Sequence, residues 1–245
     1  MAVTVGILAE SGQGKTNSVI VNPDGSIAIQ DLIKGTLTNK GKYDGMDPMT
    51  TIIVNSDRKN LPFPNPEGNG WVTGKNVFWE SDKETIKSLL KQANGVKSIK
   101  SIYVDTINGI MLDKEMNDIK KKSYDKWADL AQEIYELISF CNAELRSDII
   151  VYFSGHVTLF TDTDGNESKC LVTNGRKLEK IRIETKLPIV LFASVSKGAG
   201  GRHEYKFETQ ANRSTGKSPL GMFEDFIIPN SLMLVERKIR KYYNI

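Results

Sequence analysis

The chain has 245 residues, of which 33 are Lys or Arg and 30 are Asp or Glu, giving a net charge of +3. This length suits one α/β domain over residues 1–245, and the near-balanced charge excludes a global field that attracts nucleic acid. No apolar run approaches the roughly 20 residues of a membrane span, and Cys141 and Cys170 lack metal-ligand spacing. We therefore expect a cytoplasmic protein without a signal peptide, membrane segment or disulfide framework.

A predicted strand over residues 2–8 leads into the loop AESGQGKT at residues 9–16. A β-branched strand, a loop of small residues and Lys-Thr at a helix start are typical of a phosphate-binding loop, the Walker A motif. Ala9 replaces the usual first Gly, which is a mild departure. Gly12 and Gly14 allow backbone N–H groups to wrap an anion, Lys15 faces the terminal phosphates, and Thr16 ligates Mg²⁺. The predicted nucleotide-binding residues are Glu10, Ser11, Gly12, Gln13, Gly14, Lys15, Thr16 and Asn17.

A short helix over residues 16–21 should direct its N-terminal dipole at the bound phosphates. The segment TTIIVN at residues 50–55 predicts a strand from its β-branched residues, and polar residues 56–60 follow where a parallel strand delivers side chains to a ligand.

Beyond a loop over residues 64–75, we expect a short strand at 76–79. A helix should then begin at Ser81, with Glu84 in the capping-box position.

The segment SIYVDT at residues 101–106 resembles a Walker B strand, an apolar run that ends in a carboxylate. Asp105 would hold Mg²⁺-bound water beside Thr16 at the carboxyl edge of the sheet. The alternative is a strand-terminal Asp that caps the next turn.

A helix is predicted over residues 125–146, because Leu130, Ile134, Leu137 and other apolar residues recur at intervals of three and four. The run Lys120, Lys121 and Lys122 before it is either a solvated face or a phosphate contact. A third buried strand over residues 148–156 ends in His156. This His either reaches a γ-phosphate or hydrogen-bonds a loop.

The second half of the chain predicts antiparallel pairing. Residues 157–183 predict a β-hairpin, with strands at 157–160 and 169–172 and a turn at 162–165. Further strands are expected at 187–195 and 205–209, and the segment 227–230 leads into a helix that begins at Ser231. The predicted fold is therefore α/β, with a mostly parallel central sheet flanked by helices and an antiparallel extension in the C-terminal half.

Taken together, these segments resemble the phage RecA-like single-strand annealing ATPases, which are similar to a RecA core without its flanking domains. The matching pieces span nearly the whole chain in order: residues 6–16, 52–55, 61–63, 103–106, 124–127, 154–156, 173–178, 217–223 and 228–230. The resemblance implies a RecA-like P-loop NTPase that uses ATP and Mg²⁺, binds single-stranded DNA and promotes strand annealing in phage recombination. It also implies a homo-oligomer, a ring or filament, that works with a single-stranded-DNA-binding protein.

The resemblance also assigns roles to single residues. Lys15 and Thr16 match the phosphate and Mg²⁺ positions, Asp105 the Walker B carboxylate and His156 the strand-end sensor. RecA-like enzymes usually have a catalytic Glu after the second core strand, where this chain has Asp57; Glu80 is the reserve candidate. Hydrolysis therefore involves Lys15, Asp57 and His156, and the missing Glu disfavours fast hydrolysis.

Further cations are candidates for two other roles. Lys197, Arg202 and Lys217 lie in Gly- or Ser-rich segments and are candidates for a cation that enters the site of a neighbouring subunit. Arg176 and Lys177, with Lys120, Lys121 and Lys122 second, are the candidate DNA contacts.

Three other functions compete with annealing. A helicase loader or replication-associated ATPase would have the same fold, and a non-hydrolytic nucleotide switch that scaffolds other proteins is favoured by the missing Glu. A small-molecule kinase is disfavoured, because no Arg-rich lid is evident over the phosphate site.

Overall fold

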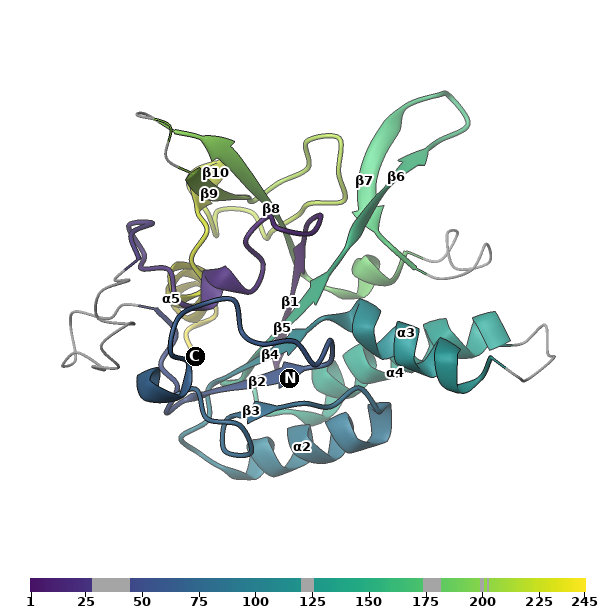
Figure 1. The fold of residues 1–245 in the computed structure, drawn as a ribbon. Helices are drawn as coiled ribbons and strands as arrows, with labels where there is room; N and C mark the ends of the chain where they lie inside the picture. The colour runs from purple at the N-terminus through teal and green to yellow at the C-terminus, as the bar shows by residue number, and fades with distance from the viewer. Residues whose placement is uncertain (28–44, 120–125, 174–181, 199–200, 202) are drawn as a thin grey trace.

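The computed structural model describes residues 1–27, 45–119, 126–173, 182–198, 201 and 203–245. Its centre is an eight-stranded sheet with the order β10-β9-β8-β1-β5-β4-β2-β3 (Figure 1). The parallel strands are β1 (Val3–Leu8), β2 (Thr51–Asn55), β3 (Val77–Phe78), β4 (Ser101–Asp105), β5 (Ile150–Gly155) and β8 (Ile189–Lys197). β9 (His203–Glu208) is antiparallel to β8, and β10 (Ile227–Pro229) is antiparallel to β9.

Helices cover both faces of the sheet, because the central strands are apolar on both sides. Val151 and Phe153 of β5 pack in the cluster that contains residues of α2 (Lys83–Gly95), α3 (Ile107–Asn117) and α4 (Lys126–Glu144). Ile150 and Tyr152 point to the opposite face, where α5 (Leu232–Tyr243) and the 3₁₀ turn η1 (Asn17–Val19) lie. The predicted fold class, a mostly parallel sheet flanked by helices with antiparallel strands toward the C-terminus, is confirmed.

The predicted hairpin is confirmed as a separate two-stranded sheet, β6 (Val157–Thr161) with β7 (Glu167–Leu171). It extends from the end of β5 beyond the carboxyl edge of the main sheet (Figure 1). Two further 3₁₀ turns are η2 (Glu67–Asn69) and η3 (Ile183–Lys186). Within the described residues, no helix is both long and apolar enough to cross a lipid bilayer.

Three local expectations are corrected. The predicted helix over 16–21 is only the three-residue turn η1, because a turn at residues 22–26 follows directly. The N-cap of α2 is Asp82 rather than Ser81, and its carboxylate accepts from the Thr85 N–H. α3 was not predicted: it begins after Thr106, whose hydroxyl accepts from the Gly109 N–H, and its exposed Leu112 and Met116 blur the apolar periodicity.

Candidate nucleotide site

The loop after β1 has the geometry that its glycines suggested. Gly12 and Gly14 have φ angles of 78° and 86°, in the left-handed region that favours glycine. A Cβ on Gly14 would lie 2.6 Å from the Tyr205 ring of β9, so a side chain is excluded there on space as well. Lys15 is buried, and its ammonium donates to the carbonyls of Ala9 at 2.9 Å and Glu10 at 2.8 Å. The Lys15 side chain therefore folds back onto the backbone of its own loop.

Lys15 is held in a partly desolvated environment. Burial lowers the pKa of this lysine to about 8, although the carboxylates of Asp105 and Asp57 act in the opposite direction. An anion that enters the loop would favour the charged ammonium. A polyphosphate is therefore the type of ligand that this lysine suits.

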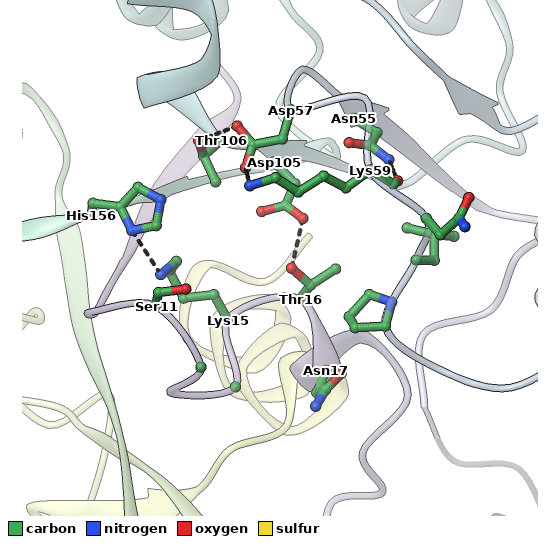
Figure 2. Close-up of a pocket in the computed structure, with 15 residues that line it drawn as sticks. Ser11, Lys15, Thr16, Asn17, Asn55, Asp57, Lys59, Asp105, Thr106 and His156 are labelled. Carbon is green, nitrogen blue, oxygen red and sulfur yellow. Dashed lines mark hydrogen bonds and ion pairs between the residues drawn. The ribbon is translucent and has the colours of Figure 1, made fainter. Parts of the chain in front are cut away.

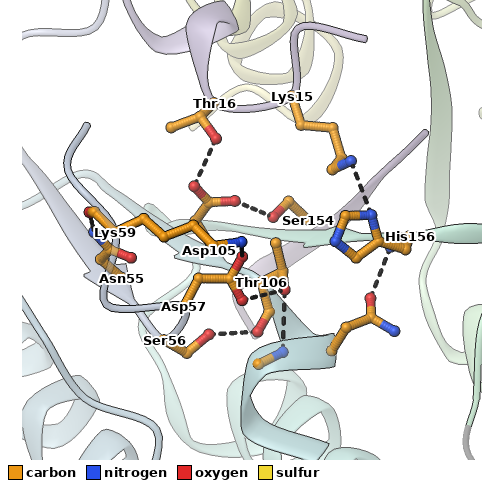
Figure 3. Close-up of polar contacts among 12 residues, drawn as sticks. Lys15, Thr16, Asn55, Ser56, Asp57, Lys59, Asp105, Thr106, Ser154 and His156 are labelled. Atoms are coloured by element: carbon orange, nitrogen blue, oxygen red, sulfur yellow. Dashed lines mark hydrogen bonds and ion pairs between the residues drawn. The ribbon is translucent and has the colours of Figure 1, made fainter. Parts of the chain in front are cut away.

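Thr16 and Asp105 meet across the sheet edge. The Thr16 hydroxyl donates to Asp105 Oδ2 at 2.6 Å, and the Ser154 hydroxyl donates to Asp105 Oδ1 at 2.6 Å (Figure 3). Burial raises the pKa of the Asp105 carboxyl, while these two hydrogen bonds act to lower it. The donor set of one carboxylate and one hydroxyl fits Mg²⁺, which keeps several waters and takes its remaining ligands from substrate phosphates. Among the described residues there is no cluster of three or more His, Cys, Asp or Glu side chains that could hold a metal ion.

Asp57 lies after β2 on the opposite side of the cavity from the loop (Figure 2). Its Oδ1 accepts from the Thr106 hydroxyl at 3.2 Å and its Oδ2 pairs with the Lys59 ammonium at 3.0 Å. α3 approaches closely because Gly109 has no side chain: a Cβ there would lie 2.6 Å from Asp57 Oδ1. Thr106 thus caps α3 and orients Asp57 with the same hydroxyl.

His156 follows β5 and faces the loop lysine. Its Nδ1 lies 3.4 Å from Lys15 Nζ, and its backbone N–H donates to Asn108 Oδ1 at 2.7 Å. Burial lowers the pKa of His156 and the nearby Lys15 charge lowers it further, so the ring is neutral near pH 7. A neutral ring has one nitrogen available as an acceptor toward Lys15.

These side chains line one cavity of about 240 Å³ (Figure 2). The loop side contributes Ser11, Gly12, Gly14, Lys15, Thr16 and Asn17, and the other strand ends contribute Asn55, Asp57, Lys59, Asn60, Leu61, Pro62, Asp105, Thr106 and His156. The side chain of Asn17 brings a buried oxygen that has no hydrogen-bond partner in the described chain. This volume can hold a phosphate chain together with its metal ion.

Two predicted loop residues point elsewhere. The Gln13 side-chain oxygen accepts from the Val195 N–H of β8 at 2.8 Å, and Glu10 is exposed, with its carboxylate 3.6 Å from the Lys169 ammonium of β7. Neither side chain lines the cavity. If these residues contact a nucleotide, the contact must come from their backbone.

The reserve carboxylate and the predicted cations lie away from the cavity or outside the described residues. Glu80 accepts from the N–H groups of Ser81 and Asp82 at 2.9 Å each, so it belongs to the start of α2. Lys197 ends β8, and the Lys217 ammonium donates to the Thr185 carbonyl at 3.3 Å; neither lines the cavity. Arg202, Arg176, Lys177, Lys120, Lys121 and Lys122 lie outside the described residues.

Sequence reasoning gave no individual role to Thr106 or Ser154, and placed Lys59 only within the polar run that follows the predicted strand at residues 50–55. Thr106 carried a signal, because a Thr directly after a predicted strand and before a Gly-containing segment is a common helix N-cap. Ser154 carried no such signal, since single polar residues near strand ends are frequent, and for Lys59 the polar run did not single out one residue.

No family model and no curated protein sequence matches this chain. Among solved structures, the chain is similar to the crystal structure of a KaiC-like protein from the hyperthermophilic archaeon Pyrococcus horikoshii OT3. The two are 12% identical, with a TM-score of 0.43, and the match covers 84% of this chain and 76% of that one.

Proposed function

We propose that this chain is a P-loop ATPase that binds Mg²⁺–ATP in the cavity between the β1 loop and the end of β2. The observation that carries the proposal is that Lys15, the Thr16–Asp105 pair, Asp57 and His156, which come from four strand ends, line a single cavity. Phosphoryl transfer depends on positioning and charge stabilisation, and these residue types supply both.

Each side chain has a defined role in this proposal. Lys15 and the loop N–H groups bind the phosphate chain, and Thr16 and Asp105 hold Mg²⁺, which neutralises phosphate charge when bound. Asp57 accepts a hydrogen bond from the attacking water, and the Thr106 hydroxyl keeps its carboxylate oriented. His156 contacts the terminal phosphate and Lys15 together. We also propose that residues 1–245 form one ATPase domain, since the main sheet contains strands from both ends of the chain.

The test is ATP turnover of the native chain and of Lys15→Ala, with Mg²⁺ and with EDTA. We expect Mg²⁺-dependent turnover that Lys15→Ala abolishes while its thermal unfolding stays cooperative. Absence of Mg²⁺–ATP binding by the native chain in calorimetry would overturn the proposal.

The finer proposal is that ATP binding serves single-stranded DNA annealing in phage recombination by a ring or filament of this chain. Its support is the resemblance of the sequence segments, together with the mixed surface charge that leaves DNA binding to local patches. Turnover measured with and without single-stranded DNA, and annealing of complementary strands, tests it. Alanine at Arg176 and Lys177 should reduce the salt dependence of single-strand binding, with the log–log slope falling by about 0.7 for each phosphate that is no longer neutralised.

A non-hydrolytic nucleotide switch is the second candidate function. It is favoured by the 3.0 Å ion pair between Asp57 and Lys59, because a carboxylate engaged by a lysine is a weaker acceptor for water. Tight Mg²⁺–ATP binding without turnover, with or without DNA, would select this function over hydrolysis.

A further inference from the structure

The segment from Asn55 to Lys59 is a closed loop with an unusual turn. The Asn55 side-chain amide donates to the Lys59 carbonyl at 2.5 Å, and the Ser56 N–H donates to the Asp105 carbonyl at 2.8 Å. Between them, Arg58 has φ of 52°, a left-handed conformation that costs a non-glycine residue about 1–2 kcal/mol. The loop is therefore fixed at both ends and strained in its middle.

The strained residue turns its side chain away from the cavity. Arg58 Nη2 donates to the Ser81 hydroxyl at 3.1 Å and lies 4.0 Å from Asp113 Oδ2, both outside the cavity. Its neighbours Asp57 and Lys59 both line the cavity (Figure 2). Backbone strain of this kind clusters at functional sites, where the surrounding structure maintains it. Here the strained residue stands between Asp57 and Lys59, and Lys59 places a cation on the wall opposite Lys15.

The Lys59 ammonium is poorly committed to its present partner. It lies 3.0 Å from Asp57 Oδ2; the Asp57 side chain is only 20% exposed, but the Lys59 side chain is 74% exposed, so water reaches the pair from the lysine side and screens it. Figure 3 shows the Lys59 side chain extended, with its ammonium at the Asp57 carboxylate. The flexible stem of Lys can change partner without any backbone movement.

We propose that Lys59 binds phosphate in the site of its own chain. When a nucleoside triphosphate binds, the Lys59 ammonium leaves Asp57 and pairs with the terminal phosphate. This inference rests on the proposed function. A terminal phosphate has more charge and more acceptor oxygens than a carboxylate, so it would compete well for the ammonium. The exchange leaves Asp57 able to accept from water. The same lysine thus blocks Asp57 in the empty site and releases it when a triphosphate is bound.

The experiment is calorimetric titration with Mg²⁺–ATPγS and Mg²⁺–ADP of the native chain, Lys59→Ala, Lys59→Arg and the control Lys75→Ala. Lys75 is exposed in the loop before β3 and lies outside the cavity. We expect Lys59→Ala to weaken ATPγS binding about tenfold and ADP binding less than about twofold, as removal of one charge-assisted hydrogen bond to the third phosphate predicts. Lys59→Arg should retain most of the preference for the triphosphate, and Lys75→Ala should match the native chain.

The double variant Asp57→Asn with Lys59→Ala separates a direct contact from an indirect one. If Lys59 touches phosphate, removing it should weaken ATPγS binding in the Asp57→Asn background as well. The inference would be overturned if Lys59→Ala left ATPγS affinity unchanged, or if it weakened ATPγS and ADP binding equally. It would also be overturned if Lys59→Ala weakened ATPγS binding in the native background but not in the Asp57→Asn background. A native chain that binds neither nucleotide would overturn the proposed function itself, whereas the other outcomes leave it standing.

Discussion

The two walls of the cavity are built on different physical principles. On the β1 side the backbone of the loop, with positive φ at Gly12 and Gly14, surrounds one buried lysine, as binding by backbone N–H groups requires. On the β2 side the wall consists of side chains, with Asp57 held between Thr106 and Lys59. Binding by backbone constrains residue type at fixed spacing, whereas binding by side chains constrains only geometry. The first wall therefore has a signature of fixed residue types, whereas the second shows in the sequence only as polar residues that follow an apolar strand.

The largest expected effect comes from a change in the β2 wall, which should lower the turnover rate and leave nucleotide affinity unchanged. Asp57→Asn should lower ATP turnover by about 10²–10⁴-fold, the range for loss of a positioned general base, with Mg²⁺–ATP affinity retained. Steady-state turnover alongside calorimetry measures both. Turnover within about threefold of the native chain would show that Asp57 does not position water.

The β1 wall can be tested by its two glycines, which form a matched pair. Both have positive φ, but a Cβ at Gly12 has open space, whereas one at Gly14 meets Tyr205. Gly12→Ala should cost about 1–2 kcal/mol of unfolding free energy from strain alone. Gly14→Ala should cost about 1–3 kcal/mol more because of the overpacking. Urea denaturation gives both values, and equal losses would contradict the packing described against β9.

The pKa of Lys15, about 8, predicts opposite pH trends for binding and for stability. Phosphate binding needs the charged ammonium, so Mg²⁺–ATP affinity should fall by up to about tenfold per pH unit above pH 8. The unfolded lysine has the ordinary pKa of 10.5, so between pH 8 and 10.5 the unfolded state binds more protons. Unfolding free energy from this group should therefore rise with pH over that range. Calorimetry and urea titration at pH 7 to 10 check both trends, and Lys15→Ala should lose both.

The smallest expected effect concerns the support of the metal ligand. Ser154→Ala removes one of the two hydroxyls that stabilise ionised Asp105, so the pKa of that carboxyl should rise further. Mg²⁺-dependent nucleotide binding needs the ionised carboxylate. As the pH is lowered, binding should therefore begin to weaken at a higher pH in the variant than in the native chain. Mg²⁺ titrations between pH 5 and 8 measure the shift. Superimposable curves would show that Ser154 does not tune Asp105.

The sequence allowed the sheet and part of the site to be predicted for a simple reason. Apolar strands that end in polar residues at 55–57, 105 and 154–156 must bring those ends to one edge when the strands are parallel. That geometry places Asp57, Asp105 and His156 near Lys15 without any contact being known in advance. The positions of these residues were therefore predictable, although their roles still await the experiments above.

The features that could not be predicted depend on tertiary contacts, which leave no local pattern in the sequence. α3 was missed because its sequence lacks a clear apolar stripe, and its start is set by Thr106 and by the approach of Gly109 to Asp57. Asp82 rather than Ser81 caps α2, since the Ser81 hydroxyl is engaged by Arg58 and Asp113. The inward turn of Lys59 follows from a left-handed residue that composition does not reveal.

The hydrogen bond from Val195 to Gln13 joins two segments that are 182 residues apart. β1 runs beside β8 only as far as Leu8 and Phe192, so beyond that point the glutamine side chain takes the place of a missing strand. A shift of the loop when an anion binds would therefore be transmitted through this hydrogen bond to the antiparallel pair β8 and β9. The β8–β9 hairpin, in which β8 ends at Lys197, is thus hydrogen-bonded to the phosphate-binding loop itself, so a fluorescent label on that hairpin is a natural reporter of occupancy.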